Sequence, residues 1–238
     1  MSLPVAILVG GLATRLRPLT EKIPKALLEI NGKPFLVYQL ELLHDAGIKE
    51  VVICVWYQGE KIQAFAGNGS QFGINIKYSF DGELSLGTGG ALKKALPYLG
   101  DAFFVLYGDS YLPCDYTTVE SVFFASRKDG LMTVYHNKGS GDKSNVHFDN
   151  GKILAYDKNN RTPQMEHIDY GLGILKSNVF TNYPEGQVLD LVEVYQDLLK
   201  ANRLAGYEIA TRFYEVGSFS GIKDFENYLK QTPGRKIQ

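Results

Sequence analysis

The segment PVAILVGGLATRLRPLTEKIPKAL, residues 4–27, joins a short apolar run to two adjacent glycines and a basic loop. Residues 4–9 are continuously apolar and stop at Gly10, which is typical of a strand buried on both faces of a parallel sheet. Ligands of such sheets bind beyond the carboxyl ends of the strands. We therefore expect Gly10 and Gly11 to line a binding site, where a backbone without Cβ atoms lets amide N–H groups approach an anion.

Strands and helices alternate through the first half of the chain. The predicted strands cover residues 4–9, 50–56, 74–79 and 102–109. The predicted helices cover residues 34–47, 60–65 and 88–100. Such alternation indicates parallel strands joined by crossover helices, and hence an α/β fold.

The second half has a different pattern. A strand is expected over 131–136, a hairpin over 147–156 with its turn at Asn150-Gly151, a strand over 170–176, and helices over 189–202 and 219–231. The chain is therefore predicted to be one α/β domain over residues 1–238, with a mixed, mainly parallel sheet flanked by helices and a small antiparallel part.

Composition excludes several classes of protein. Lys and Arg number 25 against 26 Asp and Glu, a net charge of -1, so no basic field is available for a nucleic-acid partner. Cys54 and Cys114 form neither a disulfide framework nor a metal motif. No apolar run is long enough for a membrane span and no leader is recognisable, so we expect a cytoplasmic protein without a membrane partner. A homo-oligomer is left open.

Arg15 and Lys25 follow the glycines and supply fixed positive charge. A pair of opposite unit charges ~4 Å apart interacts by ~4 kcal/mol at an effective dielectric constant near 20, so two such side chains matter for a phosphate ligand. The segment matches neither the Walker A loop nor the dinucleotide fingerprint. The alternative is an ordinary strand-to-loop turn with solvated basic residues.

The stretch GGLATRLRPLTEKIPKALLEINGKP, residues 10–34, resembles the N-terminal signature of the sugar-1-phosphate nucleotidyltransferases. It departs from the family pattern at Ala13, where glycine is usual; either the turn there differs or its φ is negative. The resemblance implies a Rossmann-like, GT-A-like fold. It also implies that Thr14 lies at the nucleotide and that Arg15 and Lys25 contact a triphosphate as catalytic residues.

The segment LGTGGALKKAL, residues 86–96, resembles the family's second motif, a glycine-rich turn that opens a helix under the base and ribose. Flat packing against a base suits its glycines, and Thr88 offers a hydroxyl. The residues predicted to bind the nucleotide from this part of the chain are Gln58, Glu83, Gly87, Thr88 and Gly108.

Two carboxylates are candidates for a Mg²⁺ site, since magnesium prefers carboxylate and phosphate oxygens. Asp109 ends the predicted strand 102–109 in the sequence YGDS, and the resemblance implies that it binds the metal and is catalytic. Glu215, in FYEVGSFSG, stands where the family usually has the second metal-binding aspartate.

The segment NVHFDNGKILAYDKNN, residues 145–160, resembles the sugar side of the family's site, with Asp157-Lys158 in place of the usual Glu-Lys pair. The alternative is a surface hairpin with a solvated ion pair. The residues predicted to bind the sugar phosphate are Asn145, Asp157, Lys158, Asp169, Tyr170 and Gly171.

The resemblance implies transfer of a nucleoside monophosphate from a triphosphate to a sugar 1-phosphate, with 1–115 as the nucleotide half and 116–238 as the sugar half. The nearest group is the heptose- and mannose-1-phosphate guanylyltransferases, with Glu83 set to accept from guanine. Three alternatives stay open: a uridylyl- or thymidylyltransferase for another sugar, such as N-acetylmuramate 1-phosphate; a glycosyltransferase; and a non-catalytic nucleotide-sugar sensor.

Overall fold

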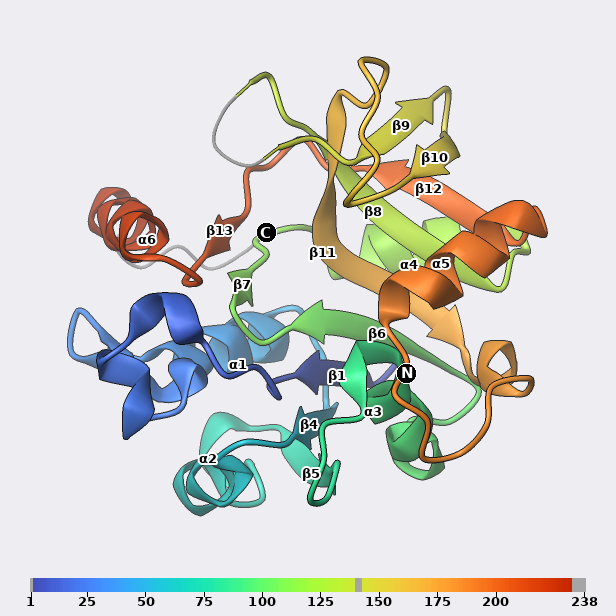
Figure 1. The fold of residues 1–238 in the computed structure, drawn as a ribbon. Coiled ribbons are helices and arrows are strands. Elements are labelled where there is room, and N and C mark those ends of the chain that lie inside the picture. The colour runs from blue at the N-terminus through green and yellow to red at the C-terminus, as the bar shows by residue number, and fades with distance from the viewer. Residues whose placement is uncertain (1, 140–142, 233–238) are drawn as a thin grey trace.

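The apolar runs of the first half form the parallel centre of a nine-stranded sheet in the computed structural model, which describes residues 2–139 and 143–232. β1 (Val5–Leu8) lies between β4 (Glu50–Val55) and β6 (Ala102–Tyr107), and β5 (Asn75–Phe80) lies beyond β4. All these pairs are parallel, as the alternation predicted. Figure 1 shows their carboxyl ends facing the same side of the molecule.

The second half continues the same sheet in mixed directions. β11 (His167–Lys176) is antiparallel to β6 and also pairs with β8 (Gly130–His136), to which β12 (Leu204–Glu208) is parallel. The hairpin of β9 (Val146–Asp149) and β10 (Lys152–Tyr156) forms the edge. This arrangement confirms the mixed α/β fold with a mainly parallel centre.

Two apolar layers lie on opposite faces of the sheet. α1 (Phe35–Asp45), α2 (Gly59–Ala66) and α4 (Tyr116–Ser126) pack into one core, and α3 (Gly87–Ala95) and α5 (Leu191–Lys200) into the other. The alternating residues of β1 divide between them, with Val5 and Ile7 in the first core and Ala6 in the second. The sheet is therefore buried on both faces, as its continuous apolar runs require.

α4 and β12 were not anticipated from the sequence. α4 is rich in threonine, valine and phenylalanine, which favour strands. It forms a helix because Asp115 caps it, accepting from the Thr118 N–H at 3.1 Å, and because Val119 and Phe123 are buried on one face. β12 contains Gly206, which weakens a strand signal; there the ring of Phe148 occupies the space that a side chain would fill.

The C-terminal helix α6 (Phe219–Gln231) has its predicted bounds and packs through Phe225 beside a pair of short strands. Phe225 is fully buried, with its ring 5.5 Å from Phe35 and 4.9 Å from Tyr111. β7 (Ser110–Tyr111) pairs with β13 (Tyr214–Glu215) beside this cluster, and a further short pair joins β2 (Glu29–Ile30) to β3 (Lys33–Pro34). The β7–β13 pair brings the chain around Glu215 next to the end of β6.

Candidate active site

The loops after β1 and β6 meet at the carboxyl edge of the parallel strands. The Gly108 N–H donates to the Leu8 carbonyl oxygen at 2.9 Å. A Cβ on Gly108 would lie 2.7 Å from that oxygen, so this close approach requires glycine. It places Asp109 directly beside the loop that begins with Gly10 and Gly11.

Lys25 and Asp109 form an ion pair, with Nζ 2.5 Å from Oδ2 and both side chains largely shielded from solvent. Lys25 is carried by a short turn that follows Pro24. Two residues 84 positions apart, each predicted from its own motif, are thus in direct contact. The contact places a cation and an anion together at the end of β6.

Arg15, Asp109 and Glu215 converge around Gly217. A Cβ built on Gly217 would lie 3.2 Å from the Arg15 guanidinium and 3.6 Å from a carboxylate oxygen of each acid. The Val216 N–H donates to the Asp109 carbonyl oxygen at 2.8 Å and holds the two acidic segments together. Arg15, near the start of the chain, and Glu215, near its end, therefore lie beside Asp109 in one site.

The turn before Arg15 keeps a left-handed backbone despite the departure to alanine. Ala13 has φ 47° and ψ 43°, which costs an L-residue roughly 1 kcal/mol or more. The Thr20 hydroxyl donates to the Ala13 carbonyl oxygen at 2.8 Å and supports this conformation. Of the two alternatives for Ala13, a different turn or a negative φ, the negative φ is therefore wrong.

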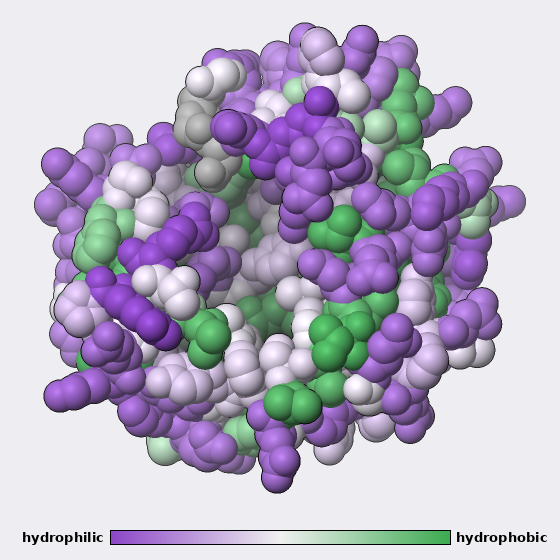
Figure 2. Space-filling view, in the orientation of Figure 1, coloured by the Kyte–Doolittle hydropathy of each residue, from purple (hydrophilic) through white to green (hydrophobic). Residues whose placement is uncertain are grey.

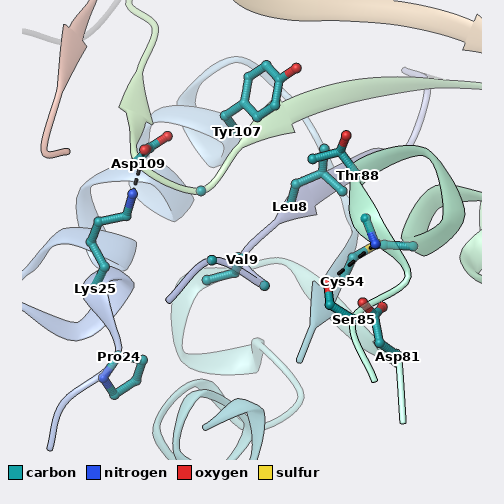
Figure 3. Close-up of a pocket in the computed structure, with 15 residues that line it drawn as sticks. Leu8, Val9, Pro24, Lys25, Cys54, Asp81, Ser85, Thr88, Tyr107 and Asp109 are labelled. Carbon is teal, nitrogen blue, oxygen red and sulfur yellow. Dashed lines mark hydrogen bonds and ion pairs between the residues drawn. The ribbon is translucent and has the colours of Figure 1, made fainter. Parts of the chain in front are cut away.

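The inner cavity, about 240 Å³, lies between these loops and the N-terminus of α3 (Figure 3). Six residues predicted to bind the nucleotide line it: Gly10, Gly11, Lys25, Gly87, Thr88 and Gly108. Asp109, predicted to bind the metal, lines it too. Four others predicted for the same ligand do not line it: Thr14, Arg15, Gln58 and Glu83. Gln58 instead holds the basic loop, since its side-chain amide donates to the Glu21 carbonyl oxygen at 3.1 Å.

Asp81 lines the inner cavity and was missed. Its Oδ2 accepts from the Leu86 N–H at 2.9 Å, whereas Oδ1 is buried without a hydrogen-bond partner among the described residues. Burial raises the pKa of this carboxyl. Figure 3 shows Asp81 across the cavity from Lys25 and Asp109. Asp81 directly follows β5 as Asp109 closely follows β6, a signal that could have found it.

The glycine-rich turn at the start of α3 serves packing as well as the cavity. A Cβ on Gly90 would lie 2.7 Å from the Gln187 carbonyl oxygen, so the helix approaches this distant segment closely. The Thr88 hydroxyl donates to Asp190 Oδ1 at 3.1 Å and accepts from the Leu191 N–H at 2.8 Å. Thr88 thus ties α3 to the N-terminus of α5.

The outer cavity, about 670 Å³ and more open, adjoins the inner one and shares Tyr107 and Asp109 with it. Five residues predicted to bind the sugar phosphate line it: Asn145, Lys158, Asp169, Tyr170 and Gly171. Arg15 and Glu215 also line it, together with Lys143 and Arg161, which were not predicted. Figure 2 shows a hollow at the centre of this face, bordered by hydrophilic side chains above and on the left and by several hydrophobic ones on the right.

Asp169 is held in place at the outer cavity by three hydrogen bonds. Its carboxylate accepts from the Tyr156 hydroxyl at 3.1 Å and from the Gly171 N–H at 3.0 Å, and its backbone N–H donates to Asn145 Oδ1 at 2.9 Å. The Lys158 ammonium lies 5.5 Å from the centre of the Tyr107 ring, a cation–π distance. Burial raises the pKa of Tyr107 and keeps its phenol neutral.

Asp157 does not line the outer cavity. Its Oδ1 accepts from the N–H groups of Asn159 and Asn160 at 2.8 and 2.9 Å, an arrangement that lowers the pKa of this exposed carboxyl. The structure therefore gives Asp157 a role in shaping the loop that carries Lys158.

The donor set at the junction of the cavities fits Mg²⁺. The described residues hold no cluster of three or more His, Cys, Asp or Glu that could form a protein-only metal cage. Magnesium instead takes one or two carboxylates and completes its shell with phosphate oxygens and water. Asp109 and Glu215, which converge at Gly217, are the carboxylates in position to hold it.

Comparison with known proteins identifies the family of the chain. The model of a family described as Nucleotidyl transferase matches residues 5–225. The chain belongs to the nucleotidyl transferase family. Within the described residues, no helix has the length and apolar character to cross a membrane.

The relatives differ in the nucleotide they are named for. N-acetylmuramate alpha-1-phosphate uridylyltransferase of Neisseria meningitidis is 30% identical over 92% of this chain and 94% of its own length. UTP–glucose-1-phosphate uridylyltransferase of Synechocystis is 33% identical over 78% of this chain. D-glycero-alpha-D-manno-heptose 1-phosphate guanylyltransferase of Campylobacter jejuni is 44% identical over 46% of this chain. The chain matches about half the length of the latter two, 52% and 48%.

The fold is also that of a solved relative. HddC from Yersinia pseudotuberculosis, in complex with GMP-PN, superposes with a TM-score of 0.80 at 23% identity, covering 95% of this chain and 99% of that one. This likeness concerns the fold, and the choice of substrates has to be argued from the cavities.

Proposed function

We propose that this nucleotidyl transferase family member transfers a nucleoside monophosphate from a triphosphate to a sugar 1-phosphate and releases pyrophosphate. The observation that carries the proposal is the position of Asp109, which lines both cavities and contacts Lys25. The inner cavity would take the nucleotide and the outer cavity the sugar phosphate. Their junction then holds the reacting phosphorus.

The reaction is an in-line displacement. An oxygen of the sugar phosphate bonds to the α-phosphorus, the bond from that phosphorus to the bridging oxygen breaks, and pyrophosphate leaves with the electron pair. The attacking phosphate is already ionised near neutral pH, so no general base is required. Positioning and charge neutralisation therefore supply most of the catalysis.

Each charged residue has a place in this step. Lys25, in the inner cavity, would neutralise charge on the triphosphate. Arg15, in the outer cavity, would neutralise charge on the α-phosphate. Lys158, held over Tyr107, would orient the attacking phosphate. Mg²⁺ bound by Asp109 and Glu215 would supply Lewis-acid stabilisation of the phosphate oxygens.

We propose GTP as the nucleotide, with Asp81 rather than Glu83 as the residue that selects the base. Guanine presents the N1–H and N2–H₂ donors side by side. Asp81 offers a buried carboxylate oxygen in the inner cavity that has no hydrogen-bond partner in the described part of the chain. Uracil and thymine present a single N–H and satisfy this carboxylate less well. Glu83 lies outside the cavity, where its carbonyl oxygen accepts from the Trp56 indole at 3.4 Å.

Mannose 1-phosphate and D-glycero-D-manno-heptose 1-phosphate are the reference acceptors, since both pair with guanylyl transfer in the names of relatives. N-acetylmuramate 1-phosphate, named for the Neisseria relative, is the alternative.

The test is release of pyrophosphate from each of five triphosphates (GTP, UTP, dTTP, CTP and ATP) with this acceptor panel in the presence of Mg²⁺. GTP should give the highest kcat/KM. Release of a nucleoside diphosphate from a finished nucleotide sugar, without pyrophosphate chemistry, would instead identify a glycosyltransferase. Tight nucleotide binding without turnover under Mg²⁺ would identify a sensor.

A further inference from the structure

The outer cavity carries two cations beyond those used by the proposed transfer. Lys158 accounts for the attacking phosphate, and Arg15 faces the α-phosphate from the same side. Lys143 and Arg161 line this cavity as well. They come from two separate loops, one before β9 and one after β10.

These two loops are fastened to each other. The Asp157 N–H donates to the Asn145 carbonyl oxygen at 3.0 Å, and Asn145 in turn accepts from the Asp169 N–H through its side chain. Asp157 also closes the turn that immediately precedes Arg161. Lys143 and Arg161 are therefore presented by a hydrogen-bonded framework.

Neither cation has an acidic partner among the residues that the structure describes. Within residues 2–139 and 143–232, Lys143 and Arg161 form no ion pair, although Asp109, Asp169 and Glu215 line the same cavity. Asp169 is already held by the Tyr156 hydroxyl and the Gly171 N–H. Unpaired cations around a cavity create a positive potential that favours an anionic ligand.

The loop between β10 and β11 carries Lys158 at its start and then extends past Arg161. Lys158 contacts Tyr107, the residue shared with the inner cavity, so the 1-phosphate belongs at that end. In Figure 1 the loop between β10 and β11 rises away from β6 and β7. Figure 2 shows strongly hydrophilic side chains overhanging the hollow from that direction. An anion held there would belong to the sugar end of the acceptor.

We propose that the preferred acceptor carries a second anionic group, a carboxylate or a phosphate, which Lys143 and Arg161 bind. The planar guanidinium of Arg161 suits both groups, since it donates two parallel hydrogen bonds to paired oxygens. The proposal rests on the proposed function and narrows its acceptor. Among the acceptors above it favours N-acetylmuramate 1-phosphate, which has a carboxylate, over the neutral mannose and heptose.

The experiment compares pairs of acceptors in which one member carries an additional anionic substituent. The pairs are glucose 1-phosphate with glucuronate 1-phosphate, N-acetylglucosamine 1-phosphate with N-acetylmuramate 1-phosphate, and mannose 1-phosphate with mannose 1,6-bisphosphate. In one or more pairs the anionic member should have the higher kcat/KM by about tenfold or more, the effect of one charge-assisted contact. The first two pairs report a carboxylate and the third a phosphate.

Variants connect the preference to the two cations. Arg161→Gln and Lys143→Gln should each reduce the ratio of kcat/KM for the anionic and neutral members about tenfold, and Arg161→Lys should reduce it less. Lys77→Gln, an exposed lysine of β5 outside both cavities, is the matched control.

The outcomes separate the two proposals. Turnover of the neutral member at least as fast in every pair overturns the second-anion inference and leaves nucleotidyl transfer intact. An equal loss for both members in Arg161→Gln and Lys143→Gln also overturns it, because the two cations then serve the 1-phosphate. Absence of pyrophosphate release with every pair overturns the proposed function; equal binding of the two members by calorimetry would then overturn the inference as well.

Discussion

The inner and outer cavities are built by different means. The inner cavity is small and is formed mainly by strand ends, glycines and apolar side chains, with Lys25, Asp81 and Asp109 as its charged residues. The outer cavity is almost three times larger, 670 against 240 Å³, and seven charged side chains line it. Five of these charged residues belong to the second half of the chain, and three of the five (Lys143, Lys158 and Arg161) lie in loops.

The difference indicates which substrate each part can vary. A wall made of parallel strand ends changes shape only if the sheet changes, so the inner cavity suits a ligand whose shape is constant. A wall made of loop side chains can change charge by single substitutions without disturbing the core. The inner cavity therefore suits the nucleotide, and the outer cavity the acceptor that distinguishes one family member from another.

The largest effect is expected for the residue that belongs to both cavities. Asp109→Asn removes the carboxylate that faces Lys25 and the proposed metal, so kcat should fall about 10³-fold or more. Pyrophosphate release at saturating substrates measures it. Asp115→Asn is the control, because asparagine also caps a helix and Asp115 lies outside both cavities. If Asp109→Asn turns over within tenfold of the unaltered chain, Asp109 is not the catalytic centre shared by the two cavities.

Lys25→Ala tests the inner cavity alone. Loss of a cation positioned for the transition state should lower kcat by about 10²–10³-fold, with a smaller change in KM for the acceptor. Lys22→Ala, an exposed lysine of the same loop, should stay close to the unaltered rate. Steady-state rates with each substrate varied in turn separate the two parameters. If acceptor KM changes as much as kcat, Lys25 serves the outer cavity as well.

The part of the inner cavity that could be predicted comes from residues whose role is set by their neighbours in sequence. Gly10, Gly11 and Asp109 follow buried strands, and an apolar run that ends in such residues identifies the edge of a parallel sheet. Asp81 follows β5 in the same way, but the strand predicted there ends at Ser79, and the base contact is predicted for Glu83. The turn that bonds Asp81 to Leu86 points one acid inward and leaves the other outside.

Contacts between distant segments could not be predicted. Thr88 contacts Asp190, 102 residues away. The close approach of Gln187 and Leu189 to Gly87 and Gly90 accounts for glycines at the start of α3 without any ligand. Lys143 and Arg161 line the same cavity because their loops are joined by the backbone hydrogen bond between Asp157 and Asn145. Nothing in either loop's own pattern indicates that their side chains share a cavity.

Asp81→Asn tests base selection within the inner cavity. Replacing one carboxylate oxygen by an amide places a donor against the donors of guanine, so kcat/KM for GTP should fall about 10–100-fold. The ratio of GTP to UTP turnover should fall with it. Glu83→Gln is the matched control and should leave that ratio unchanged, since Glu83 lies outside the cavity. If Glu83→Gln lowers the ratio of GTP to UTP turnover and Asp81→Asn does not, Glu83 selects the base.

Tyr156→Phe should have the smallest effect and should be confined to the outer cavity. It removes the 3.1 Å hydrogen bond from the phenol to Asp169 but keeps the ring that packs 6.0 Å from the Lys158 ammonium. Loss of one such bond corresponds to about 0.5–1.5 kcal/mol, or a rise of roughly two- to twelvefold in KM for the acceptor. KM for the nucleotide should not change, nor should either constant in Tyr98→Phe, an exposed tyrosine outside both cavities. Equal shifts in both KM values would mean that Asp169 acts through the shared residue Tyr107, and the two cavities would then be one coupled site.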